Sequence, residues 1–328
     1  MENNIWTPTK ISNFFNLKNK QKLFNYEKQG KIPLSKKKIK GSFSTKFWEL
    51  NDIPEIGKQL GFLNVNKNKI IFCFYTAKGG VLKTTLAYSF ARTLALNGIK
   101  TLIIGLDIQC SITDITLPQK NTEILDNSIK QYPGIYQYLY ENFDLNKIII
   151  KTLIPTLDII PETSNLNILE KKLRNEKKRE FVFKEKITDA LNDYDVIIYD
   201  NSPSWNMLIE NALVSANNIL SPIGCDIGTY ISLKTNLDTL YEFQETMNLK
   251  WNNIYLLPTL LEKTKLSQQI YGSYLNELGE KLIATPIRKA VMGQEAIITR
   301  QSPIEYDPNS NLAQDYFELF NQIWKKIN

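Results

Sequence analysis

The amino-acid sequence predicts an α/β protein, with a doubly wound, mostly parallel sheet and a small N-terminal helical winged helix-turn-helix domain. Three observations support this prediction. Short apolar runs alternate with helical stretches from residue 70 onward, and a turn rich in glycine and lysine follows the first run. The first 60 residues combine many lysines with apolar residues at helical spacing. Alternation of strands and helices is typical of a parallel sheet with helices on both faces.

The expected strands are continuous apolar runs, as found in strands that are buried on both faces of a sheet. The first is Ile70–Tyr75, and an amphipathic helix over Thr84–Asn97 follows it and ends at Gly98. The remaining runs are Thr101–Leu106, Leu157–Ile160, Val196–Tyr199, Ile219–Ile223 and Ile254–Leu257.

Length and composition bound the class of protein. The chain has 328 residues, of which 43% are hydrophobic and 23% charged, as in globular proteins. This length predicts one large and one small domain, which we assign to residues 67–328 and 1–66. No apolar run approaches the roughly 20 residues that cross a bilayer, and no signal-like stretch lies between Glu2 and Lys10. We therefore expect a cytoplasmic protein.

Histidine is absent, and the three cysteines, Cys73, Cys110 and Cys225, are widely spaced. The absence of histidine excludes Ser-His-Asp and Cys-His catalysis and the commonest zinc sites. The cysteine spacing predicts neither a disulfide framework nor a metal cluster, which is consistent with a reducing compartment.

Charge is distributed unevenly along the chain. The net charge is +6, but residues 1–70 contain fourteen lysines and five acidic residues, so this segment carries +9 and the remainder −3. A basic segment on a nearly neutral body favours a polyanion partner, most simply nucleic acid. The alternative is a solvated lysine-rich surface, because lysine outnumbers arginine 35 to 5 overall.

The N-terminal segment has the order helix, tight turn, helix, basic loop. Thr7-Pro8 predicts a helix start, and Ile11, Phe14 and Phe15 follow at helical spacing. A turn at Leu17-Lys18-Asn19 leads to a second helix that Gly30 ends, and a basic extended stretch follows. A further apolar pattern predicts a third helix; it consists of Phe43, Phe47, Trp48, Ile53, Ile56 and Leu60.

This order is that of a helix-turn-helix, and the segment resembles the winged DNA-binding domain of the MerR type. The resemblance lies in Ile11…Phe14-Phe15, in Tyr26-Glu27-Lys28-Gln29-Gly30-Lys31-Ile32-Pro33, and in Trp48–Ile53, which matches the helix after the wing. It implies base or phosphate contacts at the turn and second helix and backbone phosphate contacts from the wing. The residues concerned are Lys18, Asn19, Lys20 and Lys22, and then Lys36, Lys37 and Lys38. A small helical dimerisation or docking domain with solvated lysines is the alternative.

The strongest motif is Ala77-Lys78-Gly79-Gly80-Val81-Leu82-Lys83-Thr84-Thr85, between the first strand and its helix. Glycines allow backbone N–H groups to fold around phosphate oxygens, and a helix N-terminus adds unpaired N–H groups. In such a turn Lys83 lies between the β- and γ-phosphates and the Thr84 hydroxyl binds Mg²⁺.

The motif resembles the deviant phosphate loop of the ParA/MinD family of ATPases, K-G-G-x-G-K-[ST]. The resemblance implies ATP and Mg²⁺ as ligands and a homodimer in which Lys78 reaches the partner's nucleotide. Lys78 and Lys83 are then catalytic, and the nucleotide contacts are Lys78, Gly79, Gly80, Val81, Leu82, Lys83, Thr84 and Thr85.

Two further segments resemble this family. Gly105-Leu106-Asp107-Ile108-Gln109 matches its D-x-D-P-Q motif, which implies that Asp107 orients the attacking water and assists Mg²⁺ binding. Tyr194–Ser204 matches the strand that ends in D-x-P-P-S, which implies that Asp200 holds the metal through water. The chain departs from the pattern at Leu82, Gly105 and Ser202, which replace a glycine, the first aspartate and a proline.

The resemblance implies a ParA-type partition ATPase that is nucleoid-associated, binds DNA without sequence preference, and works with a ParB-like partner. Lys234 and Lys289 are candidates for this DNA contact, and the N-terminal domain adds operator binding and autorepression. One alternative is a MinD-like membrane-positioning ATPase that uses a C-terminal helix over Leu312–Ile327, for which membrane contact is less expected than docking on the core. Another is a regulator that binds nucleotide without hydrolysis.

Overall fold

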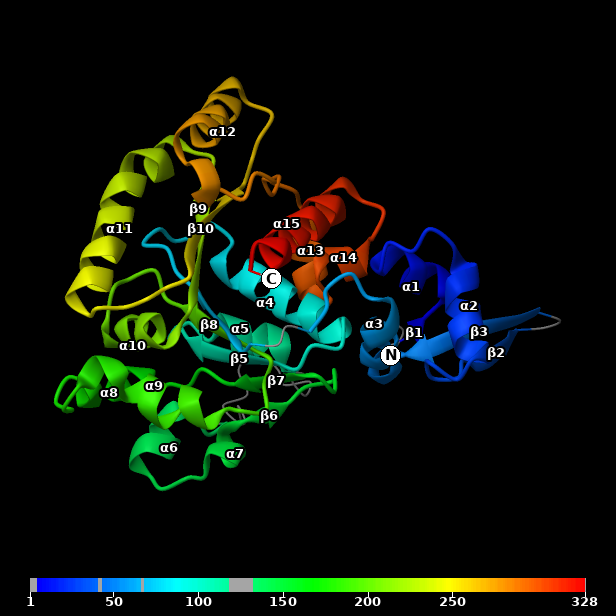
Figure 1. Ribbon diagram of the computed structural model, residues 1–328, viewed down its shortest axis with the longest axis horizontal. Helices are drawn as coiled ribbons and strands as arrows, with labels where there is room; N and C mark the ends of the chain where they lie inside the picture. The colour runs from blue at the N-terminus through cyan, green and yellow to red at the C-terminus, as the bar shows by residue number, and fades with distance from the viewer. Residues whose placement is uncertain (1–4, 41–42, 66–67, 118–131, 328) are drawn as a thin grey trace, which may run out of the picture.

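The computed structural model describes residues 5–40, 43–65, 68–117 and 132–327. Its centre is a seven-stranded sheet with the order β10-β9-β4-β8-β5-β7-β6 (Figure 1). Six of these strands are parallel, and β6 pairs antiparallel with β7 at one edge. The strands are β4 (Ile70–Phe74), β5 (Thr101–Leu106), β6 (Ile150–Lys151), β7 (Leu157–Ile160), β8 (Val196–Asn201), β9 (Asn218–Gly224) and β10 (Asn253–Thr259). All six predicted strands are confirmed, and the fold class of the large domain is the predicted one.

Helices cover both faces of the sheet, and each face has its own apolar cluster. Successive residues of β8 divide between the two clusters, since Ile198 faces one side and Ile197 the other. One face packs against α4 (Lys83–Leu96), α5 (Ser111–Thr116), α13 (Met292–Ile298), α14 (Pro303–Tyr306) and α15 (Asn311–Ile327). The other packs against α6 (Ile135–Tyr140), α7 (Leu145–Ile148), α8 (Leu166–Leu173), α9 (Val182–Lys186), α10 (Met207–Ser215) and α11 (Ile227–Thr246). The helix α12 (Lys265–Glu277) packs with α11 over the end of β9 and β10.

The N-terminal segment contains helices and a small antiparallel sheet in the order β1-β3-β2. Its elements are β1 (Ile5–Trp6), α1 (Pro8–Phe14), α2 (Lys20–Lys28), β2 (Lys36–Lys40), β3 (Phe43–Glu49) and α3 (Ile53–Leu60). The Thr7 hydroxyl accepts a hydrogen bond from Lys10 N and caps α1, as the sequence predicts. The Asn19 side chain caps α2 in the same way.

The prediction of a helical pattern from Phe43 to Leu60 is wrong over its first half. Residues 43–49 form strand β3, a 3₁₀ turn follows at Leu50–Asp52, and only Ile53–Leu60 is α-helical. Phe43 and Phe47 are four residues apart, which fits one face of a helix but also one face of a strand. The choice follows from pairing, because β3 lies between β1 and β2 and bonds to both.

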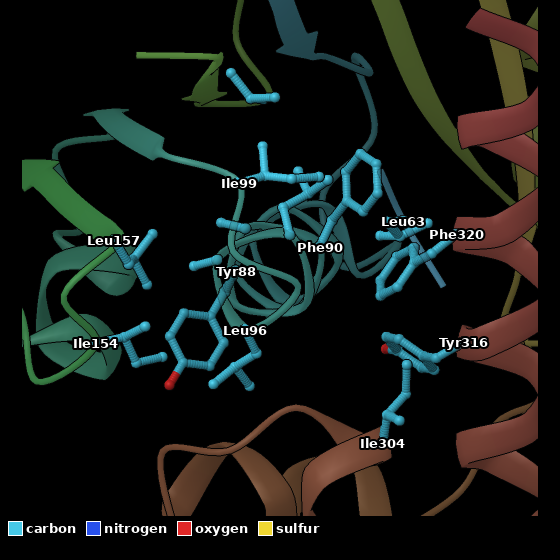
Figure 2. Packing of buried hydrophobic residues seen from close by; sticks show 14 of the residues in the cluster. Leu63, Tyr88, Phe90, Leu96, Ile99, Ile154, Leu157, Ile304, Tyr316 and Phe320 are labelled. Atoms are coloured by element: carbon cyan, nitrogen blue, oxygen red, sulfur yellow. The ribbon is translucent and has the colours of Figure 1, made fainter. Parts of the chain in front are cut away.

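The N-terminal segment packs directly on the large domain. A Cβ atom at Gly57 of α3 would lie 2.0 Å from the Leu96 carbonyl oxygen of α4, so only glycine permits this approach. The chain that follows α3 continues this contact, because Leu63 is buried. Figure 2 shows Leu63 among the side chains of the cluster that also contains Phe320 of α15.

The C-terminal helix α15 buries its apolar face. Tyr316, Phe320, Ile323 and Trp324 lie in the core, and Trp324 Nε1 donates to the Asn64 carbonyl oxygen at 2.9 Å. This arrangement confirms docking on the core, the outcome expected for the helix over Leu312–Ile327. In the described part of the chain, no helix combines the length and apolarity needed to span a membrane.

Candidate nucleotide site

The glycine-lysine turn joins the end of β4 to the start of α4, at the carboxyl edge of the sheet. Gly80 and Leu82 both adopt left-handed backbone conformations, with φ of +76° and +65°. The Cβ of Leu82 costs about 1–2 kcal/mol in this conformation. Its side chain packs against the core cluster, which offsets part of that cost. Leu82 therefore keeps the positive φ that a glycine adopts readily.

Two charged side chains face each other beneath this turn. Lys83 is the first residue of α4 and is 8% exposed, and Asp200 in β8 is fully buried. Lys83 Nζ lies 3.8 Å from Asp200 Oδ1. Burial raises the pKa of Asp200 to about 6, against the lowering effect of the Lys83 ammonium. The predicted lysine and carboxylate are thus brought together.

The Asp200 carboxylate is incompletely satisfied. Within the described part of the chain neither of its oxygens has a hydrogen-bond partner of good geometry, although the Thr84 hydroxyl lies close enough to lower the pKa of Asp200. An orphaned, fully buried carboxylate is costly unless a ligand completes it. Mg²⁺ takes one or two carboxylates and keeps several waters and phosphate oxygens, so one such carboxylate next to the Thr84 hydroxyl suits it. The residues present therefore fit a magnesium ion.

Asp107 follows β5 at the same edge of the sheet. In the register of β5 and β8, Gly105 lies opposite Asp200, and Asp107 comes two residues later. The Asp107 carboxylate accepts a hydrogen bond from Gln109 N at 3.0 Å and also raises the pKa of Asp200. Asp107 is thus half-buried near the Lys83–Asp200 pair, where the sequence predicts it.

Glu162, which the sequence analysis does not identify, is a further carboxylate at this edge. It lies two residues after β7 and is 4% exposed. Its Oε1 accepts from Asp107 N and its Oε2 from Thr113 N, each at 3.2 Å. Burial, with a contribution from Asp200, raises the pKa of Glu162 to about 8. An acidic residue directly after a buried parallel strand is the signal that identifies it.

The loop after β8 is held by short-range polar contacts. Ser202 Oγ donates to the Ser204 carbonyl oxygen at 3.2 Å, and Asn206 Nδ2 donates to Ser202 Oγ at 3.3 Å. Asn206 in turn caps α10. The serine that replaces the family's proline therefore fixes this turn by hydrogen bonds.

Lys78 points to a different partner from Lys83. Its ammonium donates to Asp226, the residue that caps α11, and lies over Gly228. Burial alone would raise the pKa of Asp226, but hydrogen bonds from Lys78 and Thr229 outweigh it and keep that pKa below its ordinary value. In the single chain Lys78 thus forms an ion pair with Asp226 of the same chain.

The residues predicted to contact DNA are exposed and lie on separate elements. They are Lys18, Asn19, Lys20 and Lys22 around the start of α2, Lys36, Lys37 and Lys38 on β2, Lys234 on α11, and Lys289 before α13. Lys36 pairs with Glu49 at 2.6 Å, and Lys289 pairs with Glu262 at 2.7 Å. Lys20 donates to Thr9 Oγ1 at 2.8 Å, and the Lys22 ammonium lies 5.9 Å from the centre of the Tyr26 ring.

A glycine turn between strand and helix, with a buried lysine and an orphaned carboxylate, defines a P-loop nucleotide-binding protein.

Comparison with known proteins agrees with this class. A family model described as an AAA domain matches residues 68–253. A chromosome-partitioning ATPase Soj from Treponema pallidum is 28% identical over 253 residues, 76% of this chain and 95% of the relative. The sporulation initiation inhibitor Soj from Bacillus subtilis is 28% identical over 254 residues, 77% of this chain and 97% of the relative.

A solved structure has the same fold. A plasmid partition protein from Borrelia burgdorferi, bound to AMPPNP, superimposes with a TM-score of 0.64 at 24% identity. The match covers 79% of this chain and all of the Borrelia chain. The chain belongs to the family of ParA-type P-loop ATPases.

Proposed function

We propose that this ATPase acts in DNA partition: it binds ATP and Mg²⁺, dimerises, binds DNA in the dimeric state, and hydrolyses ATP when a ParB-like partner stimulates it. The observation that carries the proposal is the buried Lys83–Asp200 pair with its unsatisfied carboxylate at the start of α4. Such a pair is costly without a ligand and suited to a phosphate and a magnesium ion.

The chemistry proposed is in-line attack of water on the γ-phosphorus. N–H groups of residues 79–85 and the N-terminus of α4 bind the phosphates, and Lys83 neutralises charge between the β- and γ-phosphates. Thr84 and Asp200 hold the metal, which neutralises charge on the phosphate oxygens when bound. Asp107 orients the attacking water. Catalysis depends mostly on positioning and charge neutralisation, so we expect slow basal turnover.

In the proposed dimer, Lys78 exchanges its partner. It leaves Asp226 of its own chain and reaches the nucleotide of the other subunit, where an added positive charge contributes about 10³–10⁵ in rate in comparable enzymes. Lys78 is about one-third exposed, so it can move without disturbing the core.

We propose that the N-terminal segment is a winged helix-turn-helix that binds an operator and represses the protein's own operon. Support comes from the order α1, turn, α2, then the hairpin β2–β3, whose first strand carries Lys36, Lys37 and Lys38 on its exposed surface. Non-specific DNA contact on the ATPase domain uses Lys234 and Lys289, and gives a nucleoid-associated protein. The burial of the apolar face of α15 argues against the membrane-positioning alternative.

DNA binding with ATP, with ADP and without nucleotide, at several salt concentrations, tests this function. We expect ATP to strengthen binding to any sequence, with a steep dependence on salt, because phosphate contacts dominate such binding. Retention on one sequence with ADP would support the operator role. Identical binding in all three nucleotide states would contradict the proposal. Operator binding that needs nucleotide but releases no phosphate would favour a regulator without hydrolysis.

A further inference from the structure

Gly105 stands where the D-x-D-P-Q motif has its first aspartate, and the Glu162 side chain lies next to this glycine. A Cβ atom built at Gly105 would lie 2.4 Å from Glu162 Cγ and 2.9 Å from Glu162 Cδ. Real Cβ atoms do not approach so closely, so the Glu162 side chain occupies the volume into which a side chain at 105 would grow. Gly105 lies in β5 and Glu162 lies two residues after the neighbouring strand β7, and the two strands pair in parallel up to Ile104 and Ile160.

The side chain of Glu162 also accepts two backbone hydrogen bonds. One oxygen accepts from the backbone N–H of Asp107 and the other from that of Thr113 in α5. Thr113 returns a contact, since Glu162 N donates to its Oγ1 at 2.8 Å. A single buried side chain thus ties the Asp107 segment and the start of α5 to the end of β7.

We propose that Glu162 is a positioning residue for ATP hydrolysis, supplying from the segment after β7 the carboxyl group that β5 lacks at Gly105 and holding Asp107 in place. The proposal rests on the ATPase function argued above. It explains why the chain tolerates glycine at 105: a carboxyl group is retained near Asp107 and Asp200, and only the segment that carries it differs. Glycine is then required at 105, because any Cβ there displaces Glu162.

The first test is Glu162→Ala. We expect kcat for ATP hydrolysis to fall by about 10–100-fold, as for other residues that orient a catalytic group, while KM for ATP stays within about twofold. Glu162→Gln keeps the shape but only one acceptor oxygen, so its kcat falls between those of the wild type and Glu162→Ala. A purely structural role would instead lower stability and leave kcat of the folded fraction unchanged, which would overturn the proposal.

The second test moves the carboxylate back to β5. We expect Gly105→Asp alone to lower stability, because its Cβ meets Glu162. In the Glu162→Ala background, Gly105→Asp should fold and recover about tenfold in kcat relative to Gly105→Ala/Glu162→Ala. This matched control carries the same Cβ, including its 2.9 Å approach to Ile112 Cγ2, but no carboxylate. Equal kcat values for the two double variants would overturn the proposal.

Unfolding in urea separates this inference from the proposed function. If the wild type hydrolysed no ATP, the proposed function and the catalytic part of this inference would both fail. The steric claim, that a Cβ at residue 105 and the Glu162 side chain compete for one volume, would still be tested. The test is a double-mutant cycle of Gly105→Ala and Glu162→Ala in the free energy of unfolding. We expect Gly105→Ala to destabilise the wild type by more than it destabilises Glu162→Ala. Additive effects would show that the two side-chain positions do not compete for one volume.

Discussion

Two sets of lysines in this molecule differ in how the fold holds them. Lys83, at the start of α4, is buried and lies 3.8 Å from a carboxylate that is itself fully buried. Lys36, Lys37 and Lys38, on β2, are exposed to solvent. Lys36 forms a surface pair with Glu49, in which both side chains are about half exposed.

This difference separates a site that works by geometry from a surface that works by summed charge. A buried lysine has one position and one set of partners, so its removal affects a single step strongly. Exposed lysines are individually solvated, and surface ion pairs contribute about 0–1 kcal/mol each. Phosphate binding by such residues is additive and sensitive to salt. Substitutions of buried and of exposed charged residues distinguish the two cases.

The largest effect is expected for Lys83→Ala. Loss of the ammonium between the β- and γ-phosphates should lower kcat/KM for ATP by about 10³–10⁵-fold, the range for charge clamps in phosphoryl transfer. Lys147→Ala removes an exposed lysine that pairs with Asp144 and serves as the control. A Lys83→Ala protein that hydrolyses ATP as the control does would contradict the geometric account of the site.

A second buried ion pair extends the comparison to stability. Arg92 of α4 donates two hydrogen bonds of 2.7 Å to Glu305 of α14, and both side chains are nearly inaccessible. Glu305→Ala leaves the arginine buried without an anionic partner, and we expect a loss of about 3–5 kcal/mol in the free energy of unfolding. Glu170→Ala breaks the surface pair with Arg174, whose side chain is well exposed, and should cost less than about 1 kcal/mol. Equal losses in the two variants would contradict the distinction.

The same buried pair predicts a dependence of stability on pH. Burial alone would raise the pKa of Glu305, but Arg92 outweighs it and keeps that pKa below its ordinary value. The unfolded chain therefore binds this proton more readily than the folded chain. The contribution is fully present above the ordinary carboxyl pKa and is lost as pH falls through the lower folded value. Urea unfolding at acid pH should show this loss in the wild type and not in Arg92→Met/Glu305→Met.

Gly57→Ala tests the contact between the N-terminal segment and the ATPase domain. Its Cβ would meet the Leu96 carbonyl oxygen at 2.0 Å, so α3 must shift from α4, at a cost of about 1–3 kcal/mol. Gly272→Ala, where a Cβ meets no atom within 4 Å, is the matched control. Limited proteolysis should release the N-terminal segment faster from Gly57→Ala, and equal cleavage of the two variants would count against this contact.

The smallest effect per residue is expected on β2. Replacing Lys36, Lys37 and Lys38 together by alanine should reduce the slope of log affinity against log salt by about 0.9 for each lost phosphate contact. ATP hydrolysis without DNA should not change. An unchanged slope would show that these lysines are solvated charges and make no phosphate contact.

The sequence predicted well where its signal was local. The turn at Lys78–Thr85 and its flanking strand and helix lie within one continuous segment, so spacing alone identifies them. It failed at β3, because Phe43 and Phe47 fit a helical face as well as a strand face. Only the pairing of β3 with β1 and β2 decides between them, and that pairing joins separate parts of the chain.

Glu162 was missed for a related reason. In the sequence, Gly105 takes the place of an aspartate of the motif, and no acidic residue nearby in the chain replaces it. The sequence alone therefore suggests that the function of this aspartate is lost. The proposed replacement, Glu162, lies just after the neighbouring strand β7 and becomes visible only when β5 and β7 are paired. The short range of sequence patterns therefore explains both the success at Lys83 and the failure at Glu162.

A crystal structure with AMPPNP and Mg²⁺ tests the central claim most directly. We predict the three phosphates against the N–H groups of residues 79–85, Lys83 between the β- and γ-phosphates, and the metal near Thr84 and Asp200. Crystals grown at saturating nucleotide in which this turn stays empty, or in which the nucleotide binds elsewhere, would contradict the account.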